Sequence, residues 1–339
     1  MANLPEDSVH IPVLLHEVVE GLAVSRDRRR EPVSPDASQS EVKGDTAVAE
    51  RSRWNEAPWY LDGTLGGAGH ALAIAQAFKG SINIIGLDRD PQAIERAKGR
   101  FTIHDSRSTN GKVILECESF RNLDKILDKH AVRSVDMILL DLGISSDELE
   151  NSGRGFSFMK DEPLLMTMGD PARYPFTAKD IVNGWKEEDI ANVIFAYGEE
   201  RFARRIAKAI VAYREKKSIE TTLELAEIVK TAVPGFTRRS KINPATKTFQ
   251  ALRIAVNDEL VALKEGLSKG YGRLNPGGRI AVISFHSLED RIVKDFFRGK
   301  TADGGAVLIN KKPITASPQE LAENPRSRSA KLRIIEKSI

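Results

Sequence analysis

Hydrophobic residues in the first half of the chain form short continuous runs that alternate with segments of helical periodicity. The runs of strand length are residues 59–64, 82–88, 112–119 and 135–143. The segments of helical periodicity are residues 66–78, 90–101 and 120–132. Apolar strands that alternate with helices are typical of a parallel sheet covered on both faces. The pattern predicts a doubly wound α/β core, in which ligands bind beyond the carboxyl ends of the strands.

The middle of the chain has a different pattern, because only helical periodicity is present between residues 146 and 257. The expected helices are 177–198, 199–217, 221–233 and 245–267, with Thr177 and either Thr221 or Thr222 as N-caps. Strand patterns return at 277–285 and 330–337. We therefore predict a core formed by residues 1–145 and 258–339, with a helical subdomain of residues 146–257 inserted into it.

The N-terminal region predicts one helix and one irregular segment. Residues 10–22 are amphipathic and include Pro12 near their start. Residues 25–56 are polar, charged and without sustained periodicity, which predicts a flexible insertion or long loop. A basic tether is an alternative role for it. No apolar run approaches the length of a membrane span and no secretion signal is recognisable, so a cytoplasmic protein is expected.

Composition limits the ways in which this chain can bind nucleic acid. Hydrophobic residues make up 41% of the 339 residues and the formal net charge is +3, so RNA binding would require local basic patches. Residues 201–217 and 311–337 are such patches, although solvated surfaces explain them equally well. The one cysteine, Cys117, excludes an intramolecular disulfide, and we expect it to be a buried strand residue. No cysteine or histidine spacing suggests a metal.

The turn after the first strand is the first candidate for chemistry. Gly67 and Gly69 allow the backbone to pass close to a ligand, and Asp88 follows Gly69 by 19 residues at the end of the second strand. A carboxylate there can accept hydrogen bonds from both hydroxyls of a ribose. The third glycine of the dinucleotide-binding fingerprint is absent, which argues against NAD. A tight turn without a ligand remains an alternative.

Two further aspartates stand at strand ends. A carboxylate at Asp62 would repel a pyrophosphate and would favour the ammonium group of a methionine moiety or a sulfonium. Asp141 ends the fourth strand, beside any ligand bound at this edge of the sheet. Helix capping or turn formation is the alternative role for Asp141.

Several longer segments together resemble the bacterial ribosomal RNA small-subunit methyltransferase H family, which methylates N4 of a cytidine in the decoding region of 16S rRNA. They occur in the order typical of the family and cover nearly the whole chain apart from the insertion. The segments are HIPVLLHEVVEGL, DGTLGGAGH, GLDRDPQAI, LLDLGISSDEL, RGFSF, INPATKTFQALRIAVNDEL, NPGGRIAVISFHSLEDRIVK and ENPRSRSAKLRIIEK. The resemblance implies a Rossmann-like class I methyltransferase core with S-adenosylmethionine as cofactor.

The resemblance also implies which residues contact the cofactor. These are Ala68, Gly69 and His70 in the glycine loop, Asp88 at the ribose, Phe120 beside the adenine, and Asp141 and Glu148. Glu148 stands where many members have glutamine. Leu165 and Thr167 replace an aspartate and an arginine of the family's PLDMRMD segment, and Lys247 replaces a frequent arginine, which loses bidentate geometry toward phosphate.

Methyl transfer to a cytosine amine requires positioning and an acceptor for the amine hydrogens, and Asp141 is the candidate acceptor. Arg238, Arg239, Lys241 and Lys247 are candidate RNA contacts, near Phe236 and Phe249. Those aromatic residues are equally consistent with a core. For His286 we favour a structural or substrate-orienting role over catalysis.

Three other functions stay open at this point. They are methylation of a different acceptor, a non-catalytic RNA-binding role in ribosome assembly, and a dehydrogenase activity. The sequence gives no indication of the oligomeric state.

Overall fold

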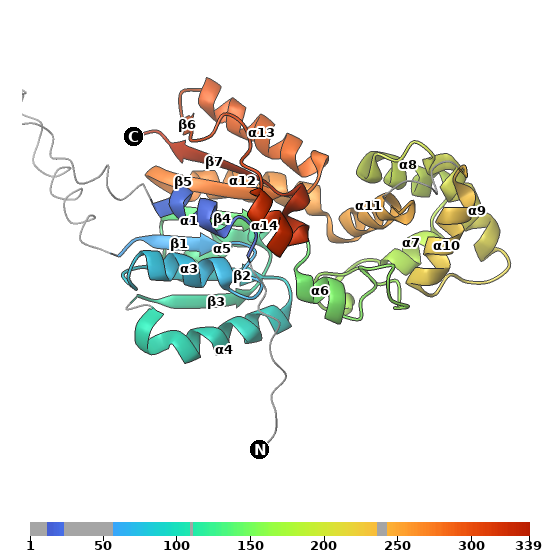
Figure 1. The fold of residues 1–339 in the computed structure, drawn as a ribbon, viewed down its shortest axis with the longest axis horizontal. Coiled ribbons are helices and arrows are strands. Elements are labelled where there is room, and N and C mark those ends of the chain that lie inside the picture. Colours follow the sequence, from blue (N-terminus) through green and yellow to red (C-terminus); the bar gives the residue numbers. More distant parts are fainter. Residues whose placement is uncertain (1–11, 24–56, 109–110, 236–242) are drawn as a thin grey trace, which may run out of the picture. The chain divides into compact units, whose positions relative to one another are not determined.

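The computed structural model describes residues 12–23, 57–108, 111–235 and 243–339. They form two compact units (Figure 1), of which the first combines residues up to Gly143 with residues from Leu263 onward, and the second comprises Ile144–Ala262. The predicted insertion at 25–56 lies outside the described residues. Phe236, Arg238, Arg239 and Lys241 also lie outside them. No helix in the described part of the chain has the length and apolar character that a membrane span requires.

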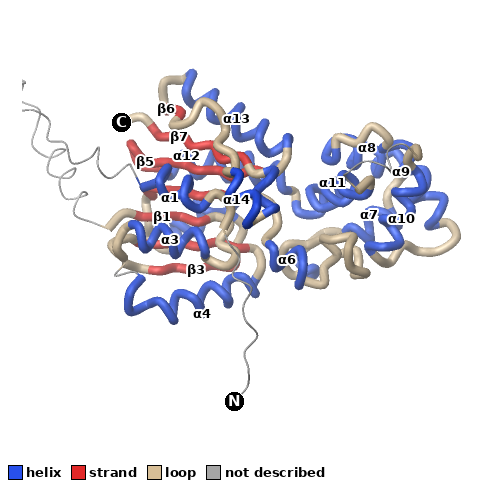
Figure 2. Tube along the Cα trace, viewed as in Figure 1, coloured by secondary structure: helices blue, strands red, loops and turns tan. Residues whose placement is uncertain are grey.

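A seven-stranded sheet forms the centre of the first unit, in the order β3-β2-β1-β4-β5-β7-β6 (Figure 2). Neighbours from β3 to β5 are parallel, and β7 is antiparallel to both β5 and β6. The strands are β1 (Trp59–Asp62), β2 (Asn83–Asp88), β3 (Val113–Cys117), β4 (Val135–Asp141), β5 (Leu274–Ser284), β6 (Ala306–Leu308) and β7 (Lys331–Lys337). This sheet confirms the predicted mostly parallel α/β core. Strand order reverses between β1 and β4, which is where ligands bind in such sheets.

Alternate side chains of each strand enter two separate hydrophobic layers. Tyr60 and Ile84 face one layer, whereas their neighbours Leu61 and Ile85 face the other. The helices of the first layer are α1 (Leu15–Ala23), α3 (Gly69–Ala77) and α4 (Pro91–Ser108). The helices of the second layer are α5 (Leu123–Lys129), α12 (Glu259–Arg273), which connects the two units, and α13 (Ser287–Ala302). Both faces of the strands are therefore buried, as their continuous apolar runs require.

The second unit is helical and has a hydrophobic core of its own. Its helices are α6 (Ser146–Asn151), α7 (Ala178–Gly184), α8 (Glu187–Gly198), α9 (Ala203–Arg214), α10 (Thr222–Ala232) and α11 (Ala245–Asn257). The Thr177 hydroxyl accepts a hydrogen bond from the Asp180 amide at the start of α7, and Thr221 does the same from Glu224 at α10. The expected capping roles of Thr177 and Thr221 are thus confirmed.

Cys117 corrects one expectation, because it is exposed and not buried. It ends β3, which lies at the edge of the sheet and is only half-buried along its length. An edge strand lacks a neighbour on one side, so its apolar sequence does not guarantee burial.

Two predicted helices are each interrupted. The segment 177–198 forms α7 and α8, because the backbone is extended at Trp185 and Lys186. The segment 245–267 is divided between α11 and α12 by Asp258, which has a left-handed conformation with φ of 51°. A break of one or two residues leaves the spacing of apolar positions nearly intact, so periodicity did not indicate either of them.

Replacing Gly198 by alanine is expected to destabilise the helical unit. A Cβ atom at this position would lie 2.6 Å from the carbonyl oxygen of Lys247, so α8 and α11 must separate. We expect a loss of roughly 1–3 kcal/mol in the free energy of unfolding, measured by urea denaturation. In the control Gly184→Ala, the new Cβ meets nothing within 4 Å, and stability should be unchanged or higher by up to about 1 kcal/mol. Equal stability of the two variants would contradict this packing.

Candidate active site

Three adjacent strands each end in an aspartate at the same edge of the sheet. Asp62 ends β1, Asp88 ends β2 and Asp141 ends β4. The register pairs Asp62 with Gly86 of β2 and with Leu139 of β4, so the other two aspartates each lie two residues beyond its partners. Parallel pairing around the switch point therefore gathers the three carboxylates that the sequence indicated.

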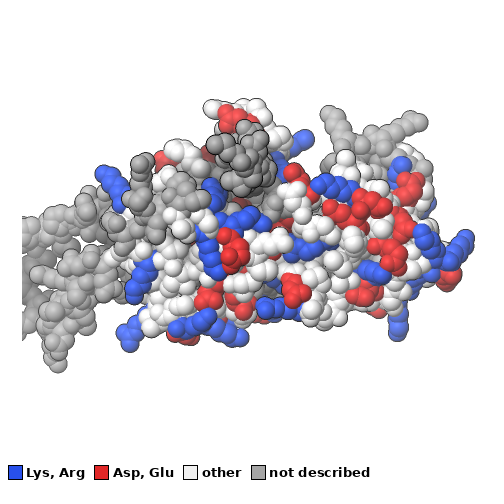
Figure 3. Space-filling model, turned by 90° about the horizontal axis from the view of Figure 1, so that it is seen from below, with Lys and Arg blue, Asp and Glu red and all other residues white. Residues whose placement is uncertain are grey.

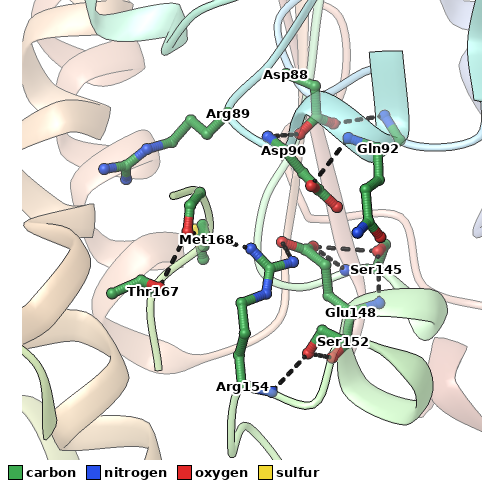
Figure 4. Close-up of polar contacts among 12 residues, drawn as sticks. Asp88, Arg89, Asp90, Gln92, Ser145, Glu148, Ser152, Arg154, Thr167 and Met168 are labelled. Carbon is green, nitrogen blue, oxygen red and sulfur yellow. Dashed lines mark hydrogen bonds and ion pairs between the residues drawn. The ribbon is translucent and has the colours of Figure 1, made fainter. Parts of the chain in front are cut away.

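Asp88 organises the turn that follows β1. Its Oδ2 accepts the Gly66 amide at 2.8 Å and its Oδ1 accepts the Asp90 amide at 2.9 Å, the latter visible in Figure 4. Burial raises the pKa of Asp88, and the two amides counteract that effect. Each carboxylate oxygen can accept a second hydrogen bond, so Asp88 can still hold two hydroxyl groups of a ligand.

Asp62 is a buried acid whose hydrogen-bond partners in the described part of the chain are a hydroxyl and an amide. Its Oδ2 accepts the Tyr60 hydroxyl at 2.9 Å, and its Oδ1 accepts the Thr64 amide at 3.2 Å. Its exposed fraction is 1%, and burial raises its pKa to about 7 despite these two bonds. No lysine or arginine among the described residues forms an ion pair with Asp62, so a cationic ligand would supply the missing countercharge.

Asp141 has one carboxylate oxygen that no described residue satisfies. Its backbone amide donates to the Thr64 hydroxyl at 2.6 Å, and its Oδ2 lies 3.8 Å from Nδ1 of His70. Its Oδ1 is buried and has no hydrogen-bond partner among the described residues. Burial, followed by the charges of Asp62 and Glu289, raises the pKa of Asp141 well above its usual range. The side chain is thus an acceptor in need of a donor.

The glycine loop leads from β1 into α3. Ala68 has φ of 60°, a left-handed conformation at the N-cap of α3. The Arg100 guanidinium donates to the carbonyl of Gly67. A Cβ atom at Gly69 would lie 2.4 Å from Cγ of Pro12, so only glycine fits there. Nε2 of His70 lies 2.9 Å from the carbonyl oxygen of Val13.

Phe120 follows β3 and begins a single turn of 3-10 helix, Phe120–Asn122. Its ring packs directly against α12, since a Cβ atom at Gly266 would lie 2.5 Å from Cδ2 of Phe120. A Cβ atom at Gly63 would lie 2.9 Å from the Cβ atom of Phe120. The base of this side chain therefore lies beside the turn after β1, and its aromatic ring is of a kind that can stack on a planar ligand.

Glu148 belongs to the helical unit and is fixed within it. Its Oε2 accepts the Ser145 amide at 3.0 Å and the Ser145 hydroxyl at 3.1 Å, which forms a capping box at the start of α6 (Figure 4). Arg154 lies 3.7 Å from its Oε1. The carboxylate of Glu148, where many family members have glutamine, is thus matched here by a nearby cation.

Thr167, which replaces an arginine of the family's PLDMRMD segment, lies in a tightly packed loop of the same unit. Thr167 is fully buried, and its hydroxyl donates to the carbonyl of Gly169. The preceding Met166 is also buried and has φ of 56°. Thr167 therefore offers no charged group where the family commonly has arginine.

The predicted RNA contacts that the structure describes have structural partners. Lys247 is exposed and its Nζ donates to the carbonyl of Glu199. Phe249 is core, because it is 4% exposed and packs edge-on against Phe158. His286 is the N-cap of α13, where its Nδ1 accepts the Glu289 amide, a structural role as favoured from the sequence.

Sequence reasoning missed three contributors to this site. Tyr60 precedes Asp62 by two residues on a strand, a spacing that puts both on one face, and this signal was available. Thr64 and Glu289 gave no such signal. Thr64 contacts both Asp62 and Asp141, and Glu289 accepts the Phe285 amide at 2.9 Å while its charge acts on Asp141.

Replacing Asp62 by asparagine is expected to flatten the pH dependence of stability. The Asp62 carboxyl has a pKa of about 7 in the folded protein, against 3.8 ordinarily. Between these two pH values the folded state binds one proton more than the unfolded state. The free energy of unfolding therefore falls as pH rises through this window. Between pH 5 and pH 8 the free energy of unfolding, measured by urea denaturation, should fall by up to about 3 kcal/mol more in the unsubstituted protein than in Asp62→Asn. Asp161→Asn, at an exposed carboxylate, should keep the original slope. Identical slopes for all three proteins would exclude this assignment.

Proteins similar in sequence to this chain are named as methyltransferases. A chain named ribosomal RNA small subunit methyltransferase H from Deinococcus deserti is 43% identical, with 99% of this chain and 98% of the relative covered. A chain of the same name from Geobacter sulfurreducens is 47% identical over 82% of this chain and 92% of the relative. The model of the MraW methylase family matches residues 7–338. The chain therefore belongs to the MraW methylase family.

Proposed function

We propose that this chain transfers a methyl group from S-adenosylmethionine to N4 of a cytidine in the decoding region of small-subunit ribosomal RNA. The observation that carries the proposal is the unsatisfied, buried Oδ1 of Asp141 at the switch point of a methyltransferase sheet. An exocyclic amine offers N–H donors that such an acceptor lacks. The names of the relatives support ribosomal RNA as the substrate.

The site has groups that fit S-adenosylmethionine. Asp88 has acceptor capacity for the two ribose hydroxyls, and Phe120 offers a ring face for the adenine. Asp62 has no cationic partner among the described residues and suits the ammonium of the methionine moiety. Gly67, Ala68, Gly69 and His70 form the loop that would pass closest to this part of the cofactor. When bound, S-adenosylmethionine supplies an electrophilic methyl group on a sulfonium.

Asp141 is the proposed proton acceptor in the transfer. The lone pair of the cytosine amine is conjugated with the ring, and a hydrogen bond from the amine to Oδ1 of Asp141 draws that nitrogen toward pyramidal geometry. Methylation of the amine nitrogen releases one of its protons, and Oδ1 of Asp141 would accept that proton while bound S-adenosylmethionine would supply the methyl group. A raised pKa makes this carboxylate a stronger base, although it must be ionised to act.

The helical unit is the proposed substrate-recognition part. Basic and acidic side chains are interspersed over the face seen in Figure 3, so RNA binding must use local groups. On α9, Arg204, Arg205 and Lys208 are exposed and share one helix face, and none has an ion pair with another described residue. By contrast, Lys331 and Arg333 in the basic C-terminal segment are paired with Asp290.

One observation keeps a second function open. Leu165 and the buried Thr167 carry no charge where the family commonly has an aspartate and an arginine. If those charges are needed for turnover, this chain would bind RNA and cofactor as an assembly factor without catalysis. Methylation of another acceptor is the other alternative.

Incubation with S-adenosylmethionine and small ribosomal subunits that lack the modification is expected to yield N4-methylcytidine at one decoding-region position. Digestion of the RNA followed by mass spectrometry would detect it. Cofactor binding measured separately, without any methylated product, would support the assembly-factor function. A different methylated nucleoside would identify another acceptor.

Asp141→Asn is expected to lower turnover by roughly 10²–10⁴-fold, the range for loss of a general base. The asparagine can still accept a hydrogen bond, so the dissociation constant for S-adenosylmethionine should stay within about threefold, which is below 1 kcal/mol. In the unsubstituted enzyme, turnover should rise with pH as Asp141 ionises, and this dependence should disappear in the variant. Full turnover in Asp141→Asn would rule out Asp141 as the proton acceptor.

A further inference from the structure

We infer that Glu320 is a positioning residue for the cofactor site, although it lies near the C-terminus of the chain. Its carboxylate fixes the turn Pro12–Leu14 against the glycine loop, and this turn orients His70. The inference rests on the proposed cofactor site, because the effect of Glu320 on binding is transmitted through His70.

The turn Pro12–Leu14 is part of the wall of the glycine loop. Pro12 packs so closely on Gly69 that no Cβ atom fits between them, the nearest approach being 2.4 Å. The next residue, Val13, presents its carbonyl oxygen to Nε2 of His70 at 2.9 Å. Two consecutive residues of the turn thus contact two consecutive residues of the loop.

The turn has a conformation that leucine does not favour by itself. Leu14 has φ of 52°, in the left-handed region, and its side chain is fully buried. Its amide donates to Oε1 of Glu320 at 2.7 Å, and its carbonyl accepts the Val18 amide in the first turn of α1. A charged acceptor strengthens the first of these bonds, which offsets the cost of the unfavourable backbone angle.

Glu320 is held in place by its own short helix, α14 (Pro318–Glu323). The Ser317 hydroxyl accepts the Glu320 amide at 3.1 Å and caps that helix. The bond from Leu14 to Glu320 therefore connects residues 306 positions apart, and it joins an anchored carboxylate to the turn.

The turn determines which ring nitrogen of His70 carries a proton. A carbonyl oxygen can only accept, so Nε2 of His70 must be the donor to Val13. In the neutral ring this leaves Nδ1 unprotonated, and Nδ1 is the atom that lies 3.8 Å from Asp141. If the turn relaxed, His70 would lose the carbonyl of Val13 as an acceptor, and the hydrogen bond that favours the Nε2-protonated tautomer would be lost.

Glu320→Ala should weaken binding of S-adenosylmethionine by roughly tenfold, about the effect of losing one charge-assisted hydrogen bond. Glu320→Gln should retain most of the affinity, since the amide oxygen still accepts the Leu14 amide. Glu323→Ala is the matched control, because Glu323 lies on the same helix and bonds only with Gln319 among the described residues. Isothermal titration calorimetry with purified full-length protein provides all three dissociation constants. Wild-type affinity in Glu320→Ala would overturn the inference.

A second measurement separates this inference from the proposed cofactor site. Nitrogen-15 NMR of the cofactor-free protein reports the tautomer of His70, which should be protonated at Nε2 in the unsubstituted protein and in Glu323→Ala. In Glu320→Ala the ring should show a mixture of tautomers. An unchanged Nε2-protonated ring in Glu320→Ala would reject the positioning role. Absence of S-adenosylmethionine binding by the unsubstituted protein would reject the cofactor site, while the tautomer data would still decide the role of Glu320.

Discussion

The candidate site in the first unit depends on enclosing one buried and two half-buried carboxylates at the ends of three adjacent parallel strands. β2, β1 and β4 lie side by side and each ends in aspartate, so the sheet that forms the core also concentrates negative charge at one edge. Burial of these groups costs free energy, which is why the pKa of each is raised. A site with this composition is stabilised by a ligand that brings hydrogen-bond donors and positive charge.

The elements around the edge compensate for this cost in different ways. Asp88 is compensated by backbone amides of the loop that it shapes, and Asp62 by Tyr60 and Thr64. Asp141 keeps one oxygen without a partner among the described residues. The group with the least compensation is thus the one proposed to meet the substrate, which agrees with the tendency of functional sites to retain unfavourable local interactions.

The sequence predicted those features that depend on local pattern. Strand-terminal aspartates were identified because apolar runs end visibly at Asp62, Asp88 and Asp141. Burial of Cys117 was predicted wrongly, since the position of β3 at the sheet edge is decided by strand order, which is not a local property. The contact between Leu14 and Glu320 gave no signal for the same reason: a backbone amide is common to nearly all residues, and its partner is 306 positions away.

The carboxylates also affect how the site discriminates between the cofactor and its product. A cation beside Asp62 favours the ionised form of that group, so binding of a positively charged ligand near pH 7 is coupled to release of a proton. The methyl donor has a positive sulfonium, whereas the product of transfer has a neutral thioether. At the proposed site, an ionised carboxylate at this edge would stabilise the donor more than the product, because only the donor adds this positive charge. Burial raises the pKa values of these carboxyl groups, so the preference for the donor would grow as pH rises and more of them are ionised.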